Sequence, residues 1–450
     1  MAEEKAPQTP LEELRSQFRG AIITPQDAEY DTARLMWNRC IEAKPDLIVH
    51  PQSINDVQVA VKHAVKHKTG LSVSGGGHGF NSKLDGTMCI DLAANLNQVV
   101  VDAANKTVWV QGGARGIDLD HGLGSYGLAT PSGTNNDTGV GGLALGGGIG
   151  WLSRKWGLMV DNMLEVHLVT AKGDLLVVNA ETEPDLFWGM RGGGTHFGVA
   201  VAIKLQAYDL KGMAQGGPMV HPFPNAVAAV TKALQTAATF GDEHACWAAW
   251  AHGPDGNPCA MTLPFAAEPG AAADAAFAPL MTDPAPVAVM NGPMPYTAVN
   301  GMLNHVQRTG LWYERAMFYE DAPSPEVIKC LHEAFAAVPA KKTSIIIGQM
   351  GGKISSVGAE DTVFAARKCQ WWVVLLCNFE ADEAEATTKW CNELYTACTA
   401  LQPSNGAYAN AVSDSNYCDP YQVNKARLTA LKKEWDPEHL FPGAKRINSC

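Results

Sequence analysis

The chain has 450 residues, 46% of them hydrophobic, and its 46 acidic and 34 basic side chains give a formal net charge of −12. This length is enough for two or three domains. The acidic balance argues against nucleic acid and anionic membrane surfaces as partners, because like charges repel. No run of about 18 apolar residues occurs, so the sequence predicts no transmembrane helix.

Eleven cysteines are scattered along the chain without a C-x-x-C pair. This pattern indicates neither a zinc nor an iron–sulfur site, so we expect no metal, and free thiols are typical of a reducing compartment. The first residues, MAEEKAPQTP, are acidic and lack the apolar core of a secretory signal. We therefore expect a cytoplasmic protein, with secretion left open.

Strands and helices alternate in the first predicted elements. DLIVHP (46–51) predicts a strand, and Ser53 predicts the start of a helix that ends at Gly70. The apolar face of this helix repeats at helical spacing through Val57, Ala60, Val61, Ala64 and Val65. Further strands are predicted for LSVS (71–74), TMCIDL (87–92) and NKTVWVQGG (105–113). This order indicates an α/β or α+β unit.

A glycine-rich run, SGGGHGF, follows the second strand and spans residues 74–80. Three consecutive glycines disfavour a helix or strand and are typical of a loop that a ligand approaches closely. Backbone N–H groups without side chains can bind phosphate oxygens. His78 is the one reactive side chain of the run, and it could attack an electrophilic cofactor carbon and form a covalent tether. A structural or surface histidine is the alternative.

A second glycine cluster fills residues 131–150, PSGTNNDTGVGGLALGGGIG. It has too much glycine for ordinary secondary structure and too many apolar residues for a flexible linker. We therefore expect a buried loop that lines a ligand. Residues 139–144 match G-x-G-x-x-A, but no buried strand precedes them, so a Rossmann site is not expected, and no P-loop motif occurs.

The next segments predict a hairpin and then a second domain. LEVHLVTAKGDLLVVN (164–179) predicts the hairpin, and residues 183–208 predict a helix, a third glycine cluster and a strand. The composition changes near residue 210, where alanine and proline become more frequent. Beyond it, helices are predicted at 225–240 and 383–401, and strands at 310–320, 341–350 and 369–380. A sheet covered by helices would form this domain.

Four motifs occur in the order and spacing of one family. They are Gly75–Gly79, the glycines of 139–148, DLFWGMRGGGTHFGV (185–199) and NKARLTALKKEWDPEHLF (424–441). The chain resembles the vanillyl-alcohol-oxidase-type flavoproteins, and specifically the berberine-bridge-enzyme-like FAD-linked oxidases. The resemblance is strong over about 41–210 and 404–447, and it covers the middle of the chain only in outline.

The resemblance implies an α+β fold. It comprises a two-subdomain FAD-binding module of the PCMH type (1–211), a substrate domain with an antiparallel sheet backed by helices (212–403), and a C-terminal segment that returns to the FAD module (404–450). The implied cofactor is FAD, with an 8α-histidyl bond to His78. The other implied cofactor contacts are Ser74, Gly75, Gly76, Gly77, Gly79, Phe80, Ser132, Gly133, Thr138, Gly141, Gly142, Gly146, Gly147, Ile149, Gly150, Val199 and Asn424.

Three departures from the family pattern bear on the chemistry. Many relatives attach the flavin a second time through a cysteine, and Asn135 stands at that position here. The resemblance therefore implies attachment through His78 only. Ser356 aligns with the catalytic glutamate of the plant alkaloid enzymes, and Lys425 stands where a tyrosine is usual.

Tyrosines of the tail are the predicted catalytic bases. Tyr408 and Tyr421 lie in the segment that supplies the tyrosine bases of sugar-oxidising relatives. A tyrosine can take a substrate proton if positive charge or a hydrogen bond lowers its pKa. Each could instead be a packed aromatic residue with a bonded hydroxyl. Glu314 and Lys425 are the next candidates.

The predicted substrate contacts lie on strands of the second domain: Trp312, Tyr313, Arg315 and Trp372. Alternation along a strand sends only some of these side chains toward the flavin. Arg367 is predicted to form a structural ion pair rather than to bind substrate.

The sequence thus predicts an FAD-dependent oxidase that passes hydride from a small alcohol, sugar or amine to flavin N5 and then to O2, giving hydrogen peroxide. One alternative is a flavoprotein that cyclises or isomerises a secondary metabolite without net use of oxygen. Another is a flavin-holding protein without turnover. The expected partners are the substrate and O2, with neither nucleic acid nor membrane, and we expect a monomer or homodimer.

Overall fold

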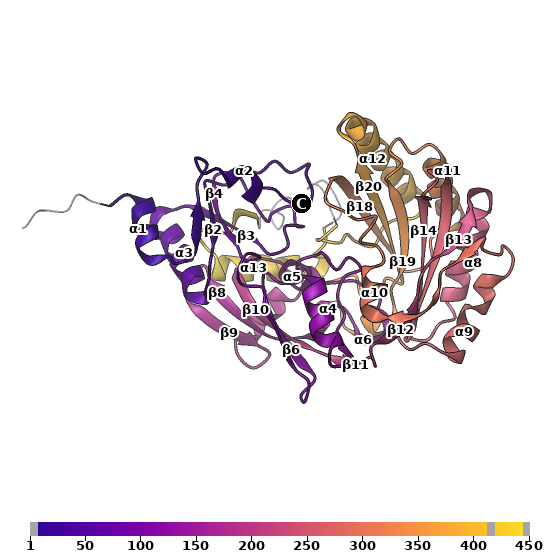
Figure 1. The fold of residues 1–450 in the computed structure, drawn as a ribbon, viewed down its shortest axis with the longest axis horizontal. Coiled ribbons are helices and arrows are strands. Elements are labelled where there is room, and N and C mark those ends of the chain that lie inside the picture. Colours follow the sequence, from indigo (N-terminus) through magenta and orange to yellow (C-terminus); the bar gives the residue numbers. More distant parts are fainter. Residues whose placement is uncertain (1–7, 412–418, 444–450) are drawn as a thin grey trace, which may run out of the picture.

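The computed structural model describes residues 8–411 and 419–443, which form two bodies (Figure 1). The first holds most of the chain before residue 212 together with α13 (Lys425–Trp435), and the second holds a large antiparallel sheet with its helices. This is the α+β architecture predicted from the sequence. Parts of the predicted first and third domains, residues 1–7, 412–418 and 444–450, lie outside the described residues.

The first sheet is mainly parallel. Its order is β1 (Ala21–Ile23), β2 (Leu47–His50), β4 (Thr87–Asp91) and β3 (Gly70–Ser74), and both β2 and β3 run parallel to β4. Helix α3 (Ile54–His67) connects β2 to β3, and the Ser53 hydroxyl caps it by accepting the Asp56 N–H at 3.2 Å. The helix ends at Lys68 in a left-handed conformation, two residues before the predicted Gly70, and Val65 is exposed although it was predicted on the apolar face.

The second sheet is antiparallel and carries the predicted hairpin, β8 to β9. Its order is β5 (Val99–Asp102), β6 (Thr107–Gln111), β10 (Gly198–Gln206), β8 (Met163–Thr170) and β9 (Leu175–Asn179). Helices α4 (Gly116–Gly124), α6 (Ser153–Trp156) and α7 (Pro184–Met190) belong to the same body, and the C-terminal helix α13 packs on α7. The tail of the chain therefore returns to the first body.

The sequence predicted a loop without regular structure for the glycine cluster at 131–150, but part of this cluster is helical. Val140–Gly146 forms a short helix, α5, which ends at Gly147 with a φ of 142°. Each glycine inside a helix costs about 1 kcal/mol relative to alanine. Here Val140, Ala144 and Leu145 are buried along one side of the helix, and this burial outweighs the poor local propensity.

The second body is built on a nine-stranded antiparallel sheet. Its strands lie in the order β16 (Ala288–Val289), β13 (Met219–Pro222), β15 (Pro258–Ala266), β14 (His244–His252), β19 (Ser344–Gln349), β20 (Trp371–Phe379) and β18 (Leu311–Tyr319). In addition β12 (Met213–Gly216) pairs with β15, and β17 (Gly292–Pro295) pairs with β12. Helices α8 (Ala226–Ala237), α11 (Pro325–Ala336) and α12 (Ala384–Leu401) cover one face. The other face joins the core of the first body, so side chains that alternate along a strand enter two different cores.

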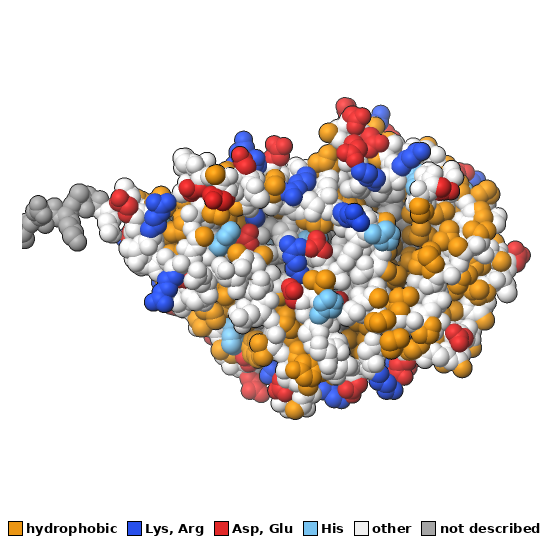
Figure 2. Space-filling view, in the orientation of Figure 1, with side chains coloured by type: hydrophobic (Ala, Val, Ile, Leu, Met, Phe, Trp, Pro, Cys, Tyr) orange, Lys and Arg blue, Asp and Glu red, His pale blue; other side chains and the backbone are white. Residues whose placement is uncertain are grey.

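The remaining elements are short: α1 (Pro10–Gln17), α2 (Tyr30–Ala33), β7 (Leu128–Ala129), η1 (Met159–Asn162), β11 (Tyr208–Asp209), η2 (Phe223–Asn225), α9 (Ala271–Phe277), η3 (Ala278–Met281), α10 (Tyr296–Gly301), η4 (Gly352–Ser356), η5 (Ala381–Glu383) and η6 (Gln422–Asn424). Strands β7 and β11 pair with each other. Figure 2 shows charged side chains of both signs over the first body and along the top of the second, and a broad area of hydrophobic side chains on the visible face of the second. Among the described residues no helix has the length and apolarity to cross a membrane, and the nine described cysteines are free thiols.

Candidate functional site

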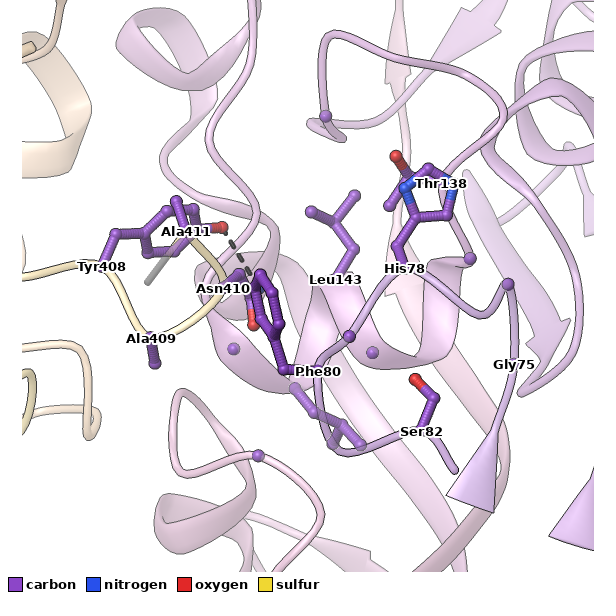
Figure 3. A pocket seen from close by; sticks show the side chains of 18 of the residues that line it. Gly75, His78, Phe80, Ser82, Thr138, Leu143, Tyr408, Ala409, Asn410 and Ala411 are labelled. Carbon is purple, nitrogen blue, oxygen red and sulfur yellow. Dashed lines mark hydrogen bonds between the residues drawn. The ribbon is translucent and has the colours of Figure 1, made fainter. Parts of the chain in front are cut away.

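A large pocket lies between the first body and the nine-stranded sheet, on the face of the sheet opposite to helices α8, α11 and α12. The three glycine clusters predicted from the sequence meet here, as residues 75–79, 133–146 and 192–194. The opposite wall comes from strands β14, β18, β19 and β20. Figure 3 shows His78 on one side of the pocket and the 408–411 segment of the tail on the other. Segments distant in sequence therefore build one site.

The glycines of this pocket serve two different purposes. Gly76 and Gly139 let two loops touch through their backbones: a Cβ on Gly76 would lie 2.3 Å from Gly139 N, and one on Gly139 would lie 2.2 Å from Gly76 N. Gly142, on α5, is exposed in the pocket, and a Cβ there would meet no atom within 4 Å. The pocket thus has a bare backbone surface that suits a phosphate-bearing cofactor such as FAD.

His78 is held by aromatic stacking and by a carboxylate. Its ring stacks on Trp37 with centroids 4.6 Å apart, and Trp37 in turn stacks on Trp312 at 4.9 Å. The His78 Nε2 lies 3.6 Å from Asp137 Oδ2, in ion-pair range, and Arg115 also pairs with Asp137. The imidazole of His78 and then the charge of Arg115 hold the pKa of the Asp137 carboxyl below its usual value. The stacking and the carboxylate therefore fix the orientation of the imidazole in the pocket.

Asn135, which the sequence resemblance aligns with a second attachment cysteine, is fixed in the pocket wall. Its Nδ2 donates to the Gln307 carbonyl at 3.1 Å, and its Oδ1 accepts the Asp137 N–H at 3.0 Å. An amide cannot form the thioether that a cysteine would form. It ties the 135–137 turn to the second body instead.

The sheet presents an aromatic and aliphatic wall with one carboxyl group in it. Trp312 and Glu314 of β18 both face the pocket, and Glu314 lies opposite Leu376 of β20. Trp372 and Trp247 line the same wall. These surroundings desolvate the carboxyl, which raises the pKa of Glu314 to about 7. Such a group can exchange a proton near neutral pH.

Tyr313 and Arg315, predicted as substrate contacts, point away from the pocket. They alternate with Trp312 and Glu314 along β18, so they lie on the face that α12 covers. The Tyr313 hydroxyl donates to Asn392 Oδ1 at 2.9 Å, and Arg315 Nε donates to the same oxygen at 3.1 Å. The prediction for these two residues is therefore corrected, whereas Trp312 and Trp372 do line the pocket.

The two predicted tyrosine bases have different surroundings. The Tyr408 hydroxyl accepts the Gly148 N–H at 3.0 Å, and burial raises the pKa of this phenol, which makes proton loss harder. The Tyr421 hydroxyl lies 3.2 Å from Nε2 of His196, and both side chains line the pocket. The structure argues against Tyr408 as the base, and it leaves Tyr421 as a prediction. Lys425, the other alternative, pairs with Asp419 at 3.1 Å and is not among the lining residues.

Most of the predicted cofactor contacts line the pocket: Gly75, Gly76, Gly77, His78, Gly79, Phe80, Gly133, Thr138, Gly141, Gly142, Gly146 and Ile149. Six others do not: Ser74, Ser132, Gly147, Gly150, Val199 and Asn424. For Asn424 the reason is clear, because its buried amide donates to the carbonyls of Ala359, at 2.7 Å, and Thr362, at 3.0 Å. Asn424 therefore stabilises a backbone segment and does not reach into the pocket.

Arg367 forms the structural ion pair that the sequence predicted. Its two terminal nitrogens donate to the two carboxylate oxygens of Asp161, each at 2.7 Å, and both side chains are almost fully buried. Sequence inspection missed three residues of the site. Asp137 and His196 lie inside two of the predicted glycine-rich motifs but were not singled out there, and Trp37 lies in no motif. Only the fold shows that these three side chains reach the pocket.

Comparison with known proteins agrees with this geometry. Residues 45–179 match the model of the FAD binding domain family. An FAD-linked oxidoreductase of Dictyostelium discoideum is 28% identical over 437 residues, which cover 96% of this chain and 95% of that protein. The (R)-6-hydroxynicotine oxidase of Paenarthrobacter nicotinovorans is 35% identical over 195 residues, which cover 43% of this chain and 42% of that protein.

Solved structures share the whole fold. The berberine bridge enzyme of Eschscholzia californica superposes with a TM-score of 0.85 at 20% identity, covering 96% of this chain and 97% of that one. This likeness extends through both bodies, whereas the domain match covers only the first. The chain therefore contains an FAD binding domain, is similar to an FAD-linked oxidoreductase over nearly its whole length, and has the fold of the berberine bridge enzyme. These findings support an FAD-dependent oxidoreductase.

Proposed function

We propose that this protein is an FAD-dependent oxidase of small, flat alcohols or amines, with Glu314 as the base that takes the substrate proton. The observation that carries the proposal is the position of Glu314, a carboxyl group in an aromatic wall that faces the glycine-lined side of the same pocket. FAD held in this pocket would supply the hydride acceptor and the route by which two electrons reach O2 to give hydrogen peroxide.

The side chains that line the pocket indicate the class of substrate. Among the described lining residues there is no Lys or Arg, so a carboxylate or phosphate on the substrate would find no permanently charged cationic side chain. Trp247, Trp312 and Trp372 offer flat apolar surfaces that suit an aromatic ring. These features favour a neutral or cationic aromatic compound with an O–H or N–H next to the C–H that is oxidised.

The role of Glu314 depends on its protonation. With its pKa raised to about 7, the side chain is a carboxylate above neutral pH and can accept a proton from the substrate. Below neutral pH it is protonated and cannot act as a base. The rate of substrate oxidation is therefore expected to rise with pH through about 7. Trp312, two residues before Glu314 on the same strand face, would hold the substrate ring against this group.

We also propose that FAD is attached covalently, through His78 alone. The stacked position of His78 beside Asp137 supports this, and so does the amide at Asn135. Acid-precipitated protein is expected to stay yellow, with one FAD added to its intact mass. His78→Ala should release all its flavin on denaturation, and flavin that stayed on this variant would contradict the single attachment. Asp137→Asn is expected to lower the attached fraction, because the carboxylate orients the imidazole.

A redox-neutral isomerase or cyclase is the second candidate. The facing pair of Tyr421 and His196 favours it, because two proton-carrying groups in one pocket could remove a proton and return it elsewhere. Steady consumption of oxygen with a turned-over substrate separates the two functions. An oxidase consumes one O2 per product, whereas an isomerase consumes none.

The test begins with a panel of aromatic amines and alcohols, sugars and alkaloids, mixed with the protein without oxygen. Loss of flavin absorbance identifies a substrate. Glu314→Gln then removes the base at nearly constant shape, and flavin reduction should slow by about 10²–10⁴-fold and lose its rise with pH. Glu320→Gln, at an exposed position just after the same strand, is the matched control. An unchanged rate and pH profile in Glu314→Gln would exclude this residue as the base.

A further inference from the structure

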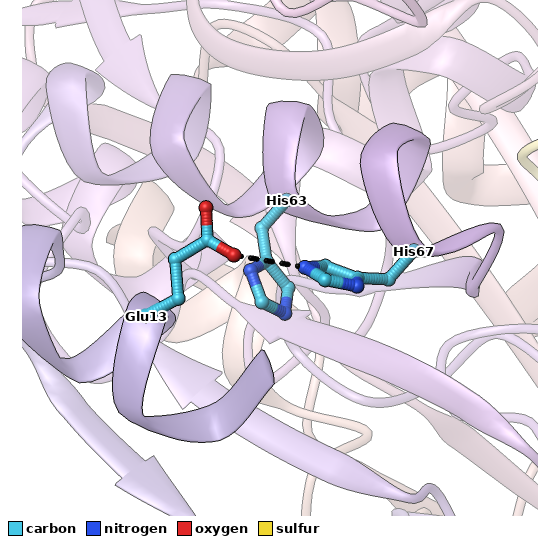
Figure 4. A group of neighbouring side chains, drawn as sticks. All are labelled: Glu13, His63 and His67. Atoms are coloured by element: carbon cyan, nitrogen blue, oxygen red, sulfur yellow. Dashed lines mark hydrogen bonds and ion pairs between the residues drawn. The ribbon is translucent and has the colours of Figure 1, made fainter. Parts of the chain in front are cut away.

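Three side chains that can bind metals meet on the first body, remote from the flavin pocket. His63 and His67 are one turn apart on α3, and Glu13 of α1 faces them (Figure 4). One ligand atom from each residue lies within 4.8 Å of the others, and the His67 Nε2 is 3.1 Å from Glu13 Oε2. None of the three lines the flavin pocket.

The fold brings these residues together without help from an ion. Thr9 and Glu12 form the capping box of α1, which leaves Glu13 free to turn toward α3. Leu14, on the same helix, is buried in the core that also holds Val57 and Val61 of α3. The carboxylate of Glu13 is therefore carried to the two imidazoles by hydrophobic packing, so a metal would not have to organise the helices.

We propose that Glu13, His63 and His67 form a binding site for a divalent transition-metal ion, with zinc as the leading candidate. Two histidines spaced i, i+4 present both imidazoles on one face of a helix, which is a known zinc-binding arrangement. Nitrogen and oxygen ligands sit about 2.0–2.2 Å from zinc. Ligand atoms already within 4.8 Å need only side-chain rotations to share one ion.

The ligand set selects the class of ion. Imidazole nitrogen suits zinc, copper, nickel and cobalt, whereas magnesium and calcium prefer oxygen ligands alone. Three protein ligands leave the remaining coordination position to water. Lys66 pairs with Glu13 Oε1, which leaves Oε2, the oxygen that faces His67, as the ligand atom of the carboxylate.

The effect of the ion would be structural. It would connect α1 to α3 at the end of the first body farthest from the nine-stranded sheet (Figure 1). Binding to the native state alone raises the stability of that state by mass action. The activity at the flavin pocket should not change.

The test uses the flavin-loaded full chain after treatment with a chelator. Calorimetric titration with Zn²⁺ should give one site, and Co²⁺ should give the visible absorption of a four-coordinate ion. His63→Ala and Glu13→Gln should each weaken Zn²⁺ binding at least about tenfold, because even the loss of an outer partner costs 10–100-fold. His305→Ala, an exposed histidine outside the cluster, should bind Zn²⁺ as the wild type does.

The melting temperature gives a second measurement. Zn²⁺ should raise it in the wild type and in His305→Ala, and should not raise it in His63→Ala. In chelator the variants should melt close to the wild type, which shows that they fold. The wild type, His63→Ala, Glu13→Gln and His305→Ala could instead bind Zn²⁺ with equal affinity, or one-site binding could survive His63→Ala and Glu13→Gln. Each of these results would mean that the three residues form only an ion-pair cluster. Either result would overturn the proposal.

Discussion

The buried carboxyl of Asp120 predicts an unusual dependence of stability on pH. Asp120 lies on α4 where this helix packs against α10, and it is 5% exposed. Asn300 of α10 donates to its Oδ2 at 2.7 Å and also lies 3.2 Å from the Ser132 hydroxyl. Burial raises the pKa of Asp120 from 3.8 to about 7, because the charged form loses its water.

The sign of this pH dependence follows from the number of protons that the folded and the unfolded chain bind. Between pH 3.8 and about 7 the folded chain holds a proton on Asp120 that the unfolded chain has lost. The free energy of unfolding therefore falls as pH rises through this window and then stays constant. A shift from 3.8 to about 7 is about three pKa units, and at about 1.36 kcal/mol per unit this gives a penalty of about 4 kcal/mol above pH 7.

Asp120→Asn tests this reasoning. Asparagine has nearly the same shape, its oxygen can accept the same hydrogen bond from Asn300, and it does not ionise. Denaturation followed by tryptophan fluorescence should give equal stability for both proteins near pH 4. Near pH 8 the variant should be more stable by at most about 4 kcal/mol. Asp321→Asn, at an exposed position, is the control. A stability difference between Asp120→Asn and wild type that is the same at both pH values would refute the account.

Three further predictions concern the cofactor surface, a buried ion pair and the tail. Gly142→Val fills the open side of α5 without backbone strain and should purify with little flavin, whereas Gly292→Val, also at an open position but in β17, should keep its flavin. Asp161→Asn leaves the Arg367 charge buried without its partner and should cost about 3–5 kcal/mol in thermal or urea unfolding. Tyr421→Phe keeps the ring and removes the hydroxyl. With a substrate in hand, its rate of flavin reduction should still rise with pH, and loss of that rise would assign the base to Tyr421 instead.

The sequence by itself determined the features that depend on local chemistry. Runs of glycine are informative in a sequence because they disfavour helices and strands and are typical of loops that a ligand approaches. The loop at His78 and the later glycine clusters therefore indicated a cofactor surface. Ser53 predicted the start of α3 through its capping hydroxyl. Hydrophobic spacing predicted α8, α12, β18, β19 and β20 of the second body, but not β13, β14, β15 or α11. The replacement at Asn135 was visible from the motif alone.

Tertiary structure decided which side chains reach the pocket. Tyr313 and Glu314 are neighbours on one strand, yet only the packing of the sheet between α12 and the first body determines which of them faces the cofactor side. The same holds for α5, whose glycines form a helix because its other side is buried. Trp37, Asp137 and the cluster around Glu13 depend on contacts between distant segments. Local propensity and periodicity contain no information on such contacts, because a hydrogen bond or stacked ring depends on position in space and not on separation along the chain.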